Sequence, residues 1–200
     1  MRQKIITIGR QFGSGGHEIG FKLSERLHIH LYDKDILDIA CNYGGLDKNK
    51  LEKMDEKAVN QYFYQTMHDG NSNVIFGVPT SEALFDLQSH EIKRIASLEN
   101  CIFIGRCADY VLKDEDVSLL RVFIHAPKEF RIQRRMELEN WSYDKSKRIV
   151  NKMDRRSAKY YHTYTKQIWG NPSNYDMVID TEKTDIEKAV NLIVERYNNL

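Results

Sequence analysis

Residues 4–27 decide the fold: Lys4-Ile-Ile-Thr-Ile-Gly-Arg-Gln-Phe-Gly-Ser-Gly-Gly16, followed by His17-Glu-Ile-Gly-Phe-Lys-Leu-Ser-Glu-Arg-Leu27. The β-branched run at the start is typical of a buried strand. Ile19, Leu23 and Leu27 lie four residues apart and predict a helix with one apolar face. Between strand and helix, glycines let successive amides turn inward, and the helix start adds positive potential. This order predicts a phosphate-binding loop, with a purely structural turn as the alternative.

Four more short apolar runs farther along the chain predict strands. They cover residues 28–32, 100–105, 119–125 and 176–180. Because segments with helical spacing separate them, we expect an α/β fold: a five-stranded parallel sheet between two layers of helices. Ligands in such sheets bind beyond the carboxyl ends of the strands. The glycine loop, Asp33 and Gly105-Arg106 all fall at those ends.

Size and composition indicate one ordinary globular domain spanning residues 1–200, with 41% hydrophobic residues and a net charge of +1. Near-neutral charge gives no overall attraction to nucleic acid or membrane, so we expect neither as a partner. The apolar runs are too short to span a bilayer, and residues 1–3 lead directly into a strand without a signal peptide. Three cysteines without a CxxC pair fit a reducing compartment. We therefore expect a cytoplasmic protein.

Residues 34–98 are more polar, and their apolar stripes predict a mostly helical region. Two further helix starts are expected in the second half of the chain. Pro127 suits the first position of a basic helix. Thr184 with Glu187 matches a capping box ahead of the last helix.

The glycine loop departs from the phosphate-binding pattern G-x-x-x-x-G-K-[ST]. Aligned on residues 13–15, Gly16 holds the lysine position, and we assign the metal-binding hydroxyl position to Glu18. The dinucleotide pattern G-x-G-x-x-G is not matched either. His17 or Arg10 is our hypothesis for the source of the missing positive charge. We expect the nucleotide to contact Arg10, Gly13, Ser14, Gly15, Gly16, His17 and Glu18.

Residues 131–159 form a basic segment with ten Lys or Arg and four Asp or Glu, so its net charge is +6 and the remainder carries −5. Lys152, Arg155, Arg156 and Lys159 follow helical spacing and can share one helix face. Phosphoryl transfer needs cations around the transferred group. We expect a lid over ATP that includes Arg131 and Arg135 from the preceding helix. A solvated basic face, or a nucleic-acid patch with interleaved aromatic residues, is the alternative.

Two residues after strand ends are candidates for the acceptor side. Arg106 can bind an acceptor phosphate with its forked donors, or it can form a surface ion pair. Asp33 can orient an acceptor group or a metal-bound water, or it can cap a helix.

In this order the segments resemble the cytidylate kinase-like branch of the nucleoside monophosphate kinases, a group of P-loop kinases. The matching segments are Ile6-Thr-Ile-Gly-Arg-Gln-Phe-Gly-Ser-Gly-Gly-His-Glu-Ile19, Leu31-Tyr-Asp-Lys-Asp35, Ile104-Gly-Arg-Cys-Ala-Asp-Tyr110, Arg131-Ile-Gln-Arg-Arg-Met136, Ile149-Val-Asn-Lys-Met-Asp-Arg155 and Val178-Ile-Asp-Thr181. The resemblance extends over essentially the whole chain.

The resemblance implies an acceptor-binding helical region at about 34–98 and a lid at about 136–160. It implies Mg²⁺ and ATP as cofactors, Arg106 as the ligand of the acceptor phosphate, and Lys152, Asp154 and Arg155 as ligands of the ATP phosphates. Arg106, Lys152 and Arg155 are thus the expected catalytic residues. Asp33 and Asp109 are further candidates for acceptor binding, and no metal ligand is assigned.

Two departures bear on the acceptor. The aspartate that cytidylate kinases use for cytosine is Cys107 here, and an arginine expected after the second strand is Ile39. We expect ATP-dependent phosphoryl transfer to a nucleoside monophosphate, with CMP or dCMP by resemblance. A non-catalytic nucleotide-binding module and a kinase for another small metabolite are the alternatives. Both a monomer and a homodimer remain open.

Overall fold

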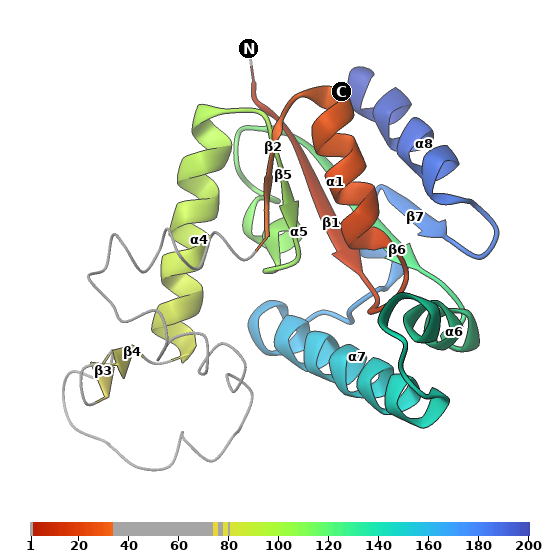
Figure 1. Ribbon diagram of the computed structural model, residues 1–200. Helices are drawn as coiled ribbons and strands as arrows, with labels where there is room; N and C mark the ends of the chain where they lie inside the picture. Colours follow the sequence, from red (N-terminus) through yellow and green to blue (C-terminus); the bar gives the residue numbers. More distant parts are fainter. Residues whose placement is uncertain (1, 34–73, 76–77, 80) are drawn as a thin grey trace.

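The computed structural model describes residues 2–33, 74–75, 78–79 and 81–200. The predicted five strands are present and form one parallel sheet (Figure 1). They are β1 (Lys4–Arg10), β2 (His30–Tyr32), β5 (Cys101–Ile104), β6 (Ser118–His125) and β7 (Met177–Asp180). Their order is β2-β5-β1-β6-β7, so the glycine loop leaves the central strand. Because all pairs are parallel, the carboxyl ends meet at one edge of the sheet.

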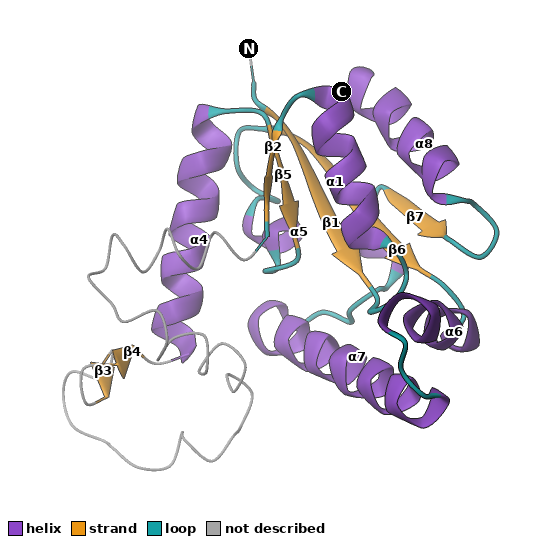
Figure 2. Cartoon of the chain, viewed as in Figure 1, coloured by secondary structure: helices purple, strands orange, loops and turns teal. Residues whose placement is uncertain are grey.

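Helices cover both faces of this sheet (Figure 2). They are α1 (Gly16–Leu27), α4 (Ser81–Leu98), α5 (Ala108–Val111), α6 (Lys128–Glu139), α7 (Tyr143–Thr165) and α8 (Ile186–Asn198). A 3₁₀ turn, Pro172–Asn174, precedes β7. No helix within the described segments is long and apolar enough to span a membrane.

Alternation along the strands divides the core into two layers, as a two-residue period requires. Ile6 and Ile8 of β1 pack on the side of α1 and α8, together with Ile19 and Ile193. Ile5 faces the opposite side, in a cluster contributed by β5, α4 and α5. These apolar residues of β1 are at most 1% exposed. The three-layer α/β prediction is therefore confirmed.

The two basic helices, α6 and α7, lie at the edge of the sheet where the carboxyl ends of the strands meet. Helix α7 crosses beneath the carboxyl ends of the strands, and α6 packs beside it (Figure 1). Asn140 ends α6 in a left-handed conformation, and Ser142 caps the start of α7. This sharp turn returns the chain across the sheet edge.

The predicted helical region at 34–98 is confirmed in part. Helix α4 occupies its last 18 residues. Short strands β3 (Val74–Ile75) and β4 (Val78–Pro79) form an antiparallel pair just before this helix, a pairing that the sequence analysis did not predict. The β-branched residues of β3 favour extended backbone. The remainder, residues 34–73 with Ile39, lies outside the described residues.

Both predicted helix starts are displaced by one residue. Pro127 is the cap of α6, and the helix begins at Lys128. Asp185 caps α8, and its Oδ1 accepts a hydrogen bond from the Lys188 amide at 2.8 Å. The capping box of Thr184 and Glu187 was therefore wrong. The Thr184 amide instead donates to the Asp180 carbonyl, which places Thr184 in the preceding turn.

Candidate phosphate-binding site

The glycine loop between β1 and α1 has a backbone that requires glycine at two positions. Gly13 and Gly15 both have φ of +83°, a region that other residues rarely adopt. Space is also lacking. A Cβ at Gly13 would lie 2.9 Å from the carbonyl oxygen of Arg131, and one at Gly15 would lie 2.6 Å from Ile186. The loop is therefore pressed against α6 and α8.

The start of α1 is open to an anion. Its cap is Gly15, so no side chain bonds to the first amides. The amides of Gly16, His17 and Glu18 have no carbonyl partner inside the helix. Together with the helix dipole, such amides form an anion-binding site.

Ser14 supports the loop from inside. Its side chain is fully buried, and its hydroxyl donates to the Gln11 carbonyl at 2.8 Å. Its own carbonyl accepts a 2.8 Å hydrogen bond from the Thr181 hydroxyl, just after β7. We predicted Ser14 as a nucleotide contact, but its side chain faces the fold, so only its backbone can serve.

Three polar side chains meet at the mouth of the loop: Arg10 at the end of β1, Asp33 just after β2, and His17 in the first turn of α1. Asp33 lies between two of them: its Oδ1 is 4.0 Å from Arg10 Nη2, and its Oδ2 is 3.5 Å from His17 Nε2. Burial lowers the pKa of the Arg10 guanidinium, Asp33 opposes this effect, and Arg106 adds to it. A positive group is thus held beside the anion-binding helix start.

Glu18 was wrongly assigned to the hydroxyl position. In G-x-x-x-x-G-K-[ST] the hydroxyl directly follows the lysine, so with Gly16 at the lysine the position belongs to His17. Glu18 instead pairs with Arg134 of α6 at 2.6 Å. Its carboxylate thereby links the first turn of α1 to the basic helix.

Arg131 is a buried side chain that holds the glycine loop through hydrogen bonds. It is 4% exposed, and its Nε donates to the Ala126 carbonyl at 2.9 Å. Its Nη1 donates to the Phe12 carbonyl at 3.0 Å and to Asp154 Oδ2 at 2.7 Å. Asp154 Oδ1 accepts from the Phe12 amide at 3.1 Å. The loop, α6 and α7 are therefore joined through one guanidinium and one carboxylate.

Arg135 sits between aromatic rings. Its guanidinium carbon lies 4.7 Å from the centre of the Phe12 ring and 5.5 Å from that of Trp141. It also pairs with Glu139 one turn later on α6. These contacts, worth about 0.5–2 kcal/mol each, order the turn from α6 to α7.

The turn after β5 is strained around Arg106. Gly105, Arg106 and Cys107 have consecutive φ values of +71°, +56° and +55°. Left-handed backbone costs a non-glycine residue about 1–2 kcal/mol, and such strain concentrates at functional sites. The turn places Arg106 close enough to Arg10 for their charges to interact.

Asp109 points into the fold. It is 8% exposed, and its Oδ2 accepts a 2.6 Å hydrogen bond from the Tyr161 hydroxyl near the end of α7. Burial raises the pKa of Asp109, although the Tyr161 hydrogen bond lowers it. Burial, followed by the charge of Asp109, raises the pKa of Tyr161. The pair ties α7 to α5, and the role of Asp109 in acceptor binding stays a prediction.

The basic face of α7 is present as spaced in the sequence. Lys152, Arg155 and Lys159 are exposed, and Arg156 is half-buried. Their helix crosses the edge where the loop opens (Figure 1). Their contacts with ATP stay predictions.

Sequence reasoning missed three residues of the site: Phe12, Thr181 and Tyr161. Phe12 is the aromatic residue inside the glycine loop, which was a usable signal. Thr181 and Tyr161 gave no local signal, because their partners Ser14 and Asp109 are 167 and 52 residues away.

The comparison with protein families settles the relationship. The model of the cytidylate kinase-like family matches residues 5–183. The chain belongs to this family. A cytidylate kinase of Methanocaldococcus jannaschii is 30% identical over 98% of both chains. A cytidylate kinase of Methanopyrus kandleri is 23% identical over 94% of this chain and 90% of its own.

Solved structures agree with this family on the fold. An uncharacterized protein from Eubacterium ventriosum superposes with a TM-score of 0.73 and 26% identity, over 99% of this chain and all of that chain. A gluconokinase from Sinorhizobium meliloti has a TM-score of 0.57 at 14% identity, over 100% and 97% of the chains. A shikimate kinase from Bacteroides thetaiotaomicron has 0.54 at 12% identity, over 97% and 98%. The last two share the P-loop kinase fold alone.

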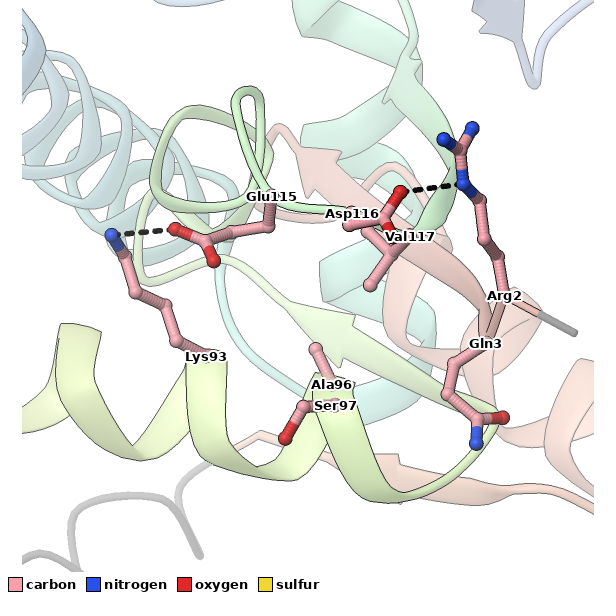
Figure 3. Close-up of a pocket in the computed structure, with 8 residues that line it drawn as sticks. All are labelled: Arg2, Gln3, Lys93, Ala96, Ser97, Glu115, Asp116 and Val117. Carbon is pink, nitrogen blue, oxygen red and sulfur yellow. Dashed lines mark ion pairs between the residues drawn. The ribbon is translucent and has the colours of Figure 1, made fainter.

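The protein has a cavity of about 560 Å³ that no residue of the glycine loop lines, and Figure 3 shows its lining side chains. Arg2 and Val117 line it, next to the first residues of β1 and β6, so it is at the amino ends of the strands. Ion pairs between Lys93 and Glu115 and between Arg2 and Asp116 flank it. Parallel sheets bind ligands at the opposite edge, so this cavity is not the candidate site.

Proposed function

We propose that this kinase-like protein transfers the γ-phosphoryl group of Mg²⁺-bound ATP to a small acceptor, a nucleoside monophosphate such as CMP or dCMP. The observation that carries the proposal is the uncapped start of α1 behind the glycine loop, with Arg10 and Arg106 at neighbouring strand ends. Amides and guanidinium groups are the donors that phosphate oxygens bind best. Membership of the family and relatives named cytidylate kinase support the reaction class.

Each group of residues has its own role in the proposed phosphoryl transfer. The loop and the first amides of α1 bind the donor phosphates, and Arg106 binds the acceptor phosphate. Lys152 and Arg155 on α7 stabilise charge on the transferred group. Bound ATP supplies an electrophilic γ-phosphorus: an acceptor oxygen bonds to it as the bond to the β–γ bridging oxygen breaks, which releases ADP.

Mg²⁺ fits the same site with few protein ligands. Within the described segments, no group of three His, Cys, Asp or Glu side chains forms a metal cage. Mg²⁺ in kinases needs only one or two carboxylates besides phosphate and water. Asp33 fits this requirement, because its contacts to Arg10 and His17 are long and its side chain is 21% exposed.

One observation favours a different acceptor, which makes a kinase for another small metabolite the second candidate. Cys107 stands where cytidylate kinases carry the cytosine-binding aspartate. It is 3% exposed, and burial raises the pKa of its thiol. A neutral buried thiol cannot replace a carboxylate in hydrogen bonding to a base.

The test measures ADP release from Mg²⁺-ATP with a panel of nucleoside monophosphates, shikimate and gluconate. Wild type is compared with Arg106→Ala and with Arg2→Ala, whose arginine lies at the opposite edge of the sheet. We expect turnover with one monophosphate, a loss of about 100-fold in Arg106→Ala, and no change in Arg2→Ala. Turnover with a panel member that is not a nucleotide would name the second candidate. ATP binding without turnover on any acceptor would leave a nucleotide-binding module.

A further inference from the structure

The glycine loop lacks the P-loop lysine, and its sequence shows where the charge has gone. With Gly15 as the second glycine of G-x-x-x-x-G-K-[ST], the first glycine position falls on Arg10 and the lysine position on Gly16. The pattern here is therefore Arg-x-x-x-x-Gly-Gly-His. A glycine and a cationic residue have changed places across the loop.

The structure gives a steric reason for this exchange. A Cβ at Gly16 would lie 2.5 Å from Arg10 Cβ and 3.1 Å from Arg10 Cγ. Cβ is fixed by the backbone, so rotation of the arginine cannot relieve the closer contact. The stem of Arg10 thus occupies the space in which a lysine at position 16 would begin.

The head of Arg10 extends over a second glycine. A Cβ at Gly105 would lie 2.7 Å from Arg10 Nη1, so a side chain there would push the guanidinium away. Gly105 follows β5 and has φ of +71°, which glycine tolerates best. Gly16 and Gly105 therefore line a path that leads Arg10 from the end of β1 to the strand end next to it.

The guanidinium retains donors for a ligand. Its side chain is 33% exposed, and among the described residues its one ion pair is the 4.0 Å contact with Asp33. By comparison, the guanidinium of Arg131 already donates hydrogen bonds to two carbonyls and a carboxylate. Arg10 is therefore held in place by its surroundings, while the hydrogen-bond donors of its guanidinium remain available to a ligand.

We propose that Arg10 takes the place of the P-loop lysine and binds the β- and γ-phosphates of the nucleotide, with Asp33 orienting its guanidinium. This inference rests on the proposed nucleotide site and adds the residue that supplies its charge. A forked guanidinium binds two phosphate oxygens at once, whereas lysine is a point charge. His17, exposed at the start of α1, takes the hydroxyl position beside it.

The test uses binding of fluorescent mant-ADP to the full chain, so that it does not depend on turnover. The variants are Arg10→Ala, Arg10→Lys, Gly16→Lys, Arg10→Gly and the double exchange Arg10→Gly with Gly16→Lys. Arg2→Ala is the matched control. Thermal unfolding of each variant, measured in parallel, separates loss of binding from loss of fold.

We expect Arg10→Ala to weaken mant-ADP binding about 10- to 100-fold, as loss of a charge-assisted contact does. Arg10→Lys retains part of the affinity. Gly16→Lys lowers the melting temperature, because its stem meets that of Arg10. The double exchange binds more tightly than Arg10→Gly alone. The double variant is the more decisive test, since it replaces the lost arginine with a positive charge at position 16.

Two results overturn the inference. Unchanged affinity of Arg10→Ala for mant-ADP shows that another group binds the β-phosphate, and His17→Ala then tests the remaining candidate. A double exchange that binds no better than Arg10→Gly shows that positions 10 and 16 do not substitute for each other. If wild type itself binds no mant-ADP while Arg2→Ala and wild type are both folded, the proposed nucleotide function fails, and this inference fails with it.

Discussion

Two of the arginines that contact the glycine loop, Arg10 and Arg131, use the same side chain in opposite ways. Arg131 is 4% exposed and donates to the Ala126 and Phe12 carbonyls and to Asp154. Arg10 is one-third exposed and meets Asp33 only at 4.0 Å. The sequence marks both as cations next to phosphate. Their surroundings show that one stabilises the loop and the other remains available to a ligand.

The largest expected effect comes from removing the buried arginine. Arg131→Ala removes the guanidinium that pairs with the Asp154 carboxylate and bonds to two carbonyls, so we expect a loss of about 3–5 kcal/mol in the free energy of unfolding. Urea denaturation measures it. Arg134→Ala, one turn along α6 with an exposed partner, and Arg10→Ala should each cost less than about 1 kcal/mol. Similar losses in Arg131→Ala and Arg10→Ala would erase the contrast between the two arginines.

A smaller effect is expected at the far end of α7. Tyr161→Phe removes the hydroxyl that bonds to the buried Asp109 carboxylate, and we expect a loss of about 1–3 kcal/mol in unfolding free energy. Tyr143→Phe is the control at the other end of the helix, because its hydroxyl meets exposed Glu129 at 3.3 Å. Should both variants unfold alike, the Asp109 contact would not anchor α7.

The smallest effect is a pH dependence of stability. Burial raises the pKa of Asp109 above its usual value of 3.8, so the folded state retains the proton longer than the unfolded state. The stability due to this group is complete below pH 3.8 and is lost as pH rises through the folded pKa. Asp109→Asn removes that loss. Its advantage over wild type should grow with pH by at most about 1.4 kcal/mol per unit.

Urea denaturation of Asp109→Asn at several pH values between about pH 4 and pH 8 checks this slope. Asp114→Asn, at a carboxylate that is 84% exposed, is the control and should follow wild type throughout. A constant difference between Asp109→Asn and wild type over this range would show that Asp109 does not titrate with folding.

The sequence was sufficient for the sheet and for the placement of the glycine loop, Asp33 and Arg106 at one edge of it. Apolar runs located the strands, and parallel topology brings their carboxyl ends to one edge. The sequence was not sufficient to show which cations already have hydrogen-bond partners within the fold. Residue type gives the charge of Arg131. Its hydrogen bonds, however, depend on Phe12 and Asp154, which are 142 residues apart in the chain.

Short-range competition explains the other differences. Thr184 and Asp185 both suit a helix cap, and the backbone turn from Asp180 selected Asp185. Tyr161 belongs to a tyrosine-rich stretch that we weighed as a nucleic-acid surface. The hydroxyl of Tyr161 is instead buried against Asp109, a partner that no local pattern identifies.

The closeness of Gly16 to Arg10, 2.5 Å from a would-be Cβ, has a consequence for how such loops diverge. A loop with lysine at position 16 cannot gain Arg10 without a clash, and the present loop cannot lose Arg10 without losing its charge. The two positions are therefore coupled. Whichever of them changes first, the intermediate loop either contains the clash or lacks the positive charge. Among related chains, a bulky side chain should occur at position 10 or at position 16, and not at both.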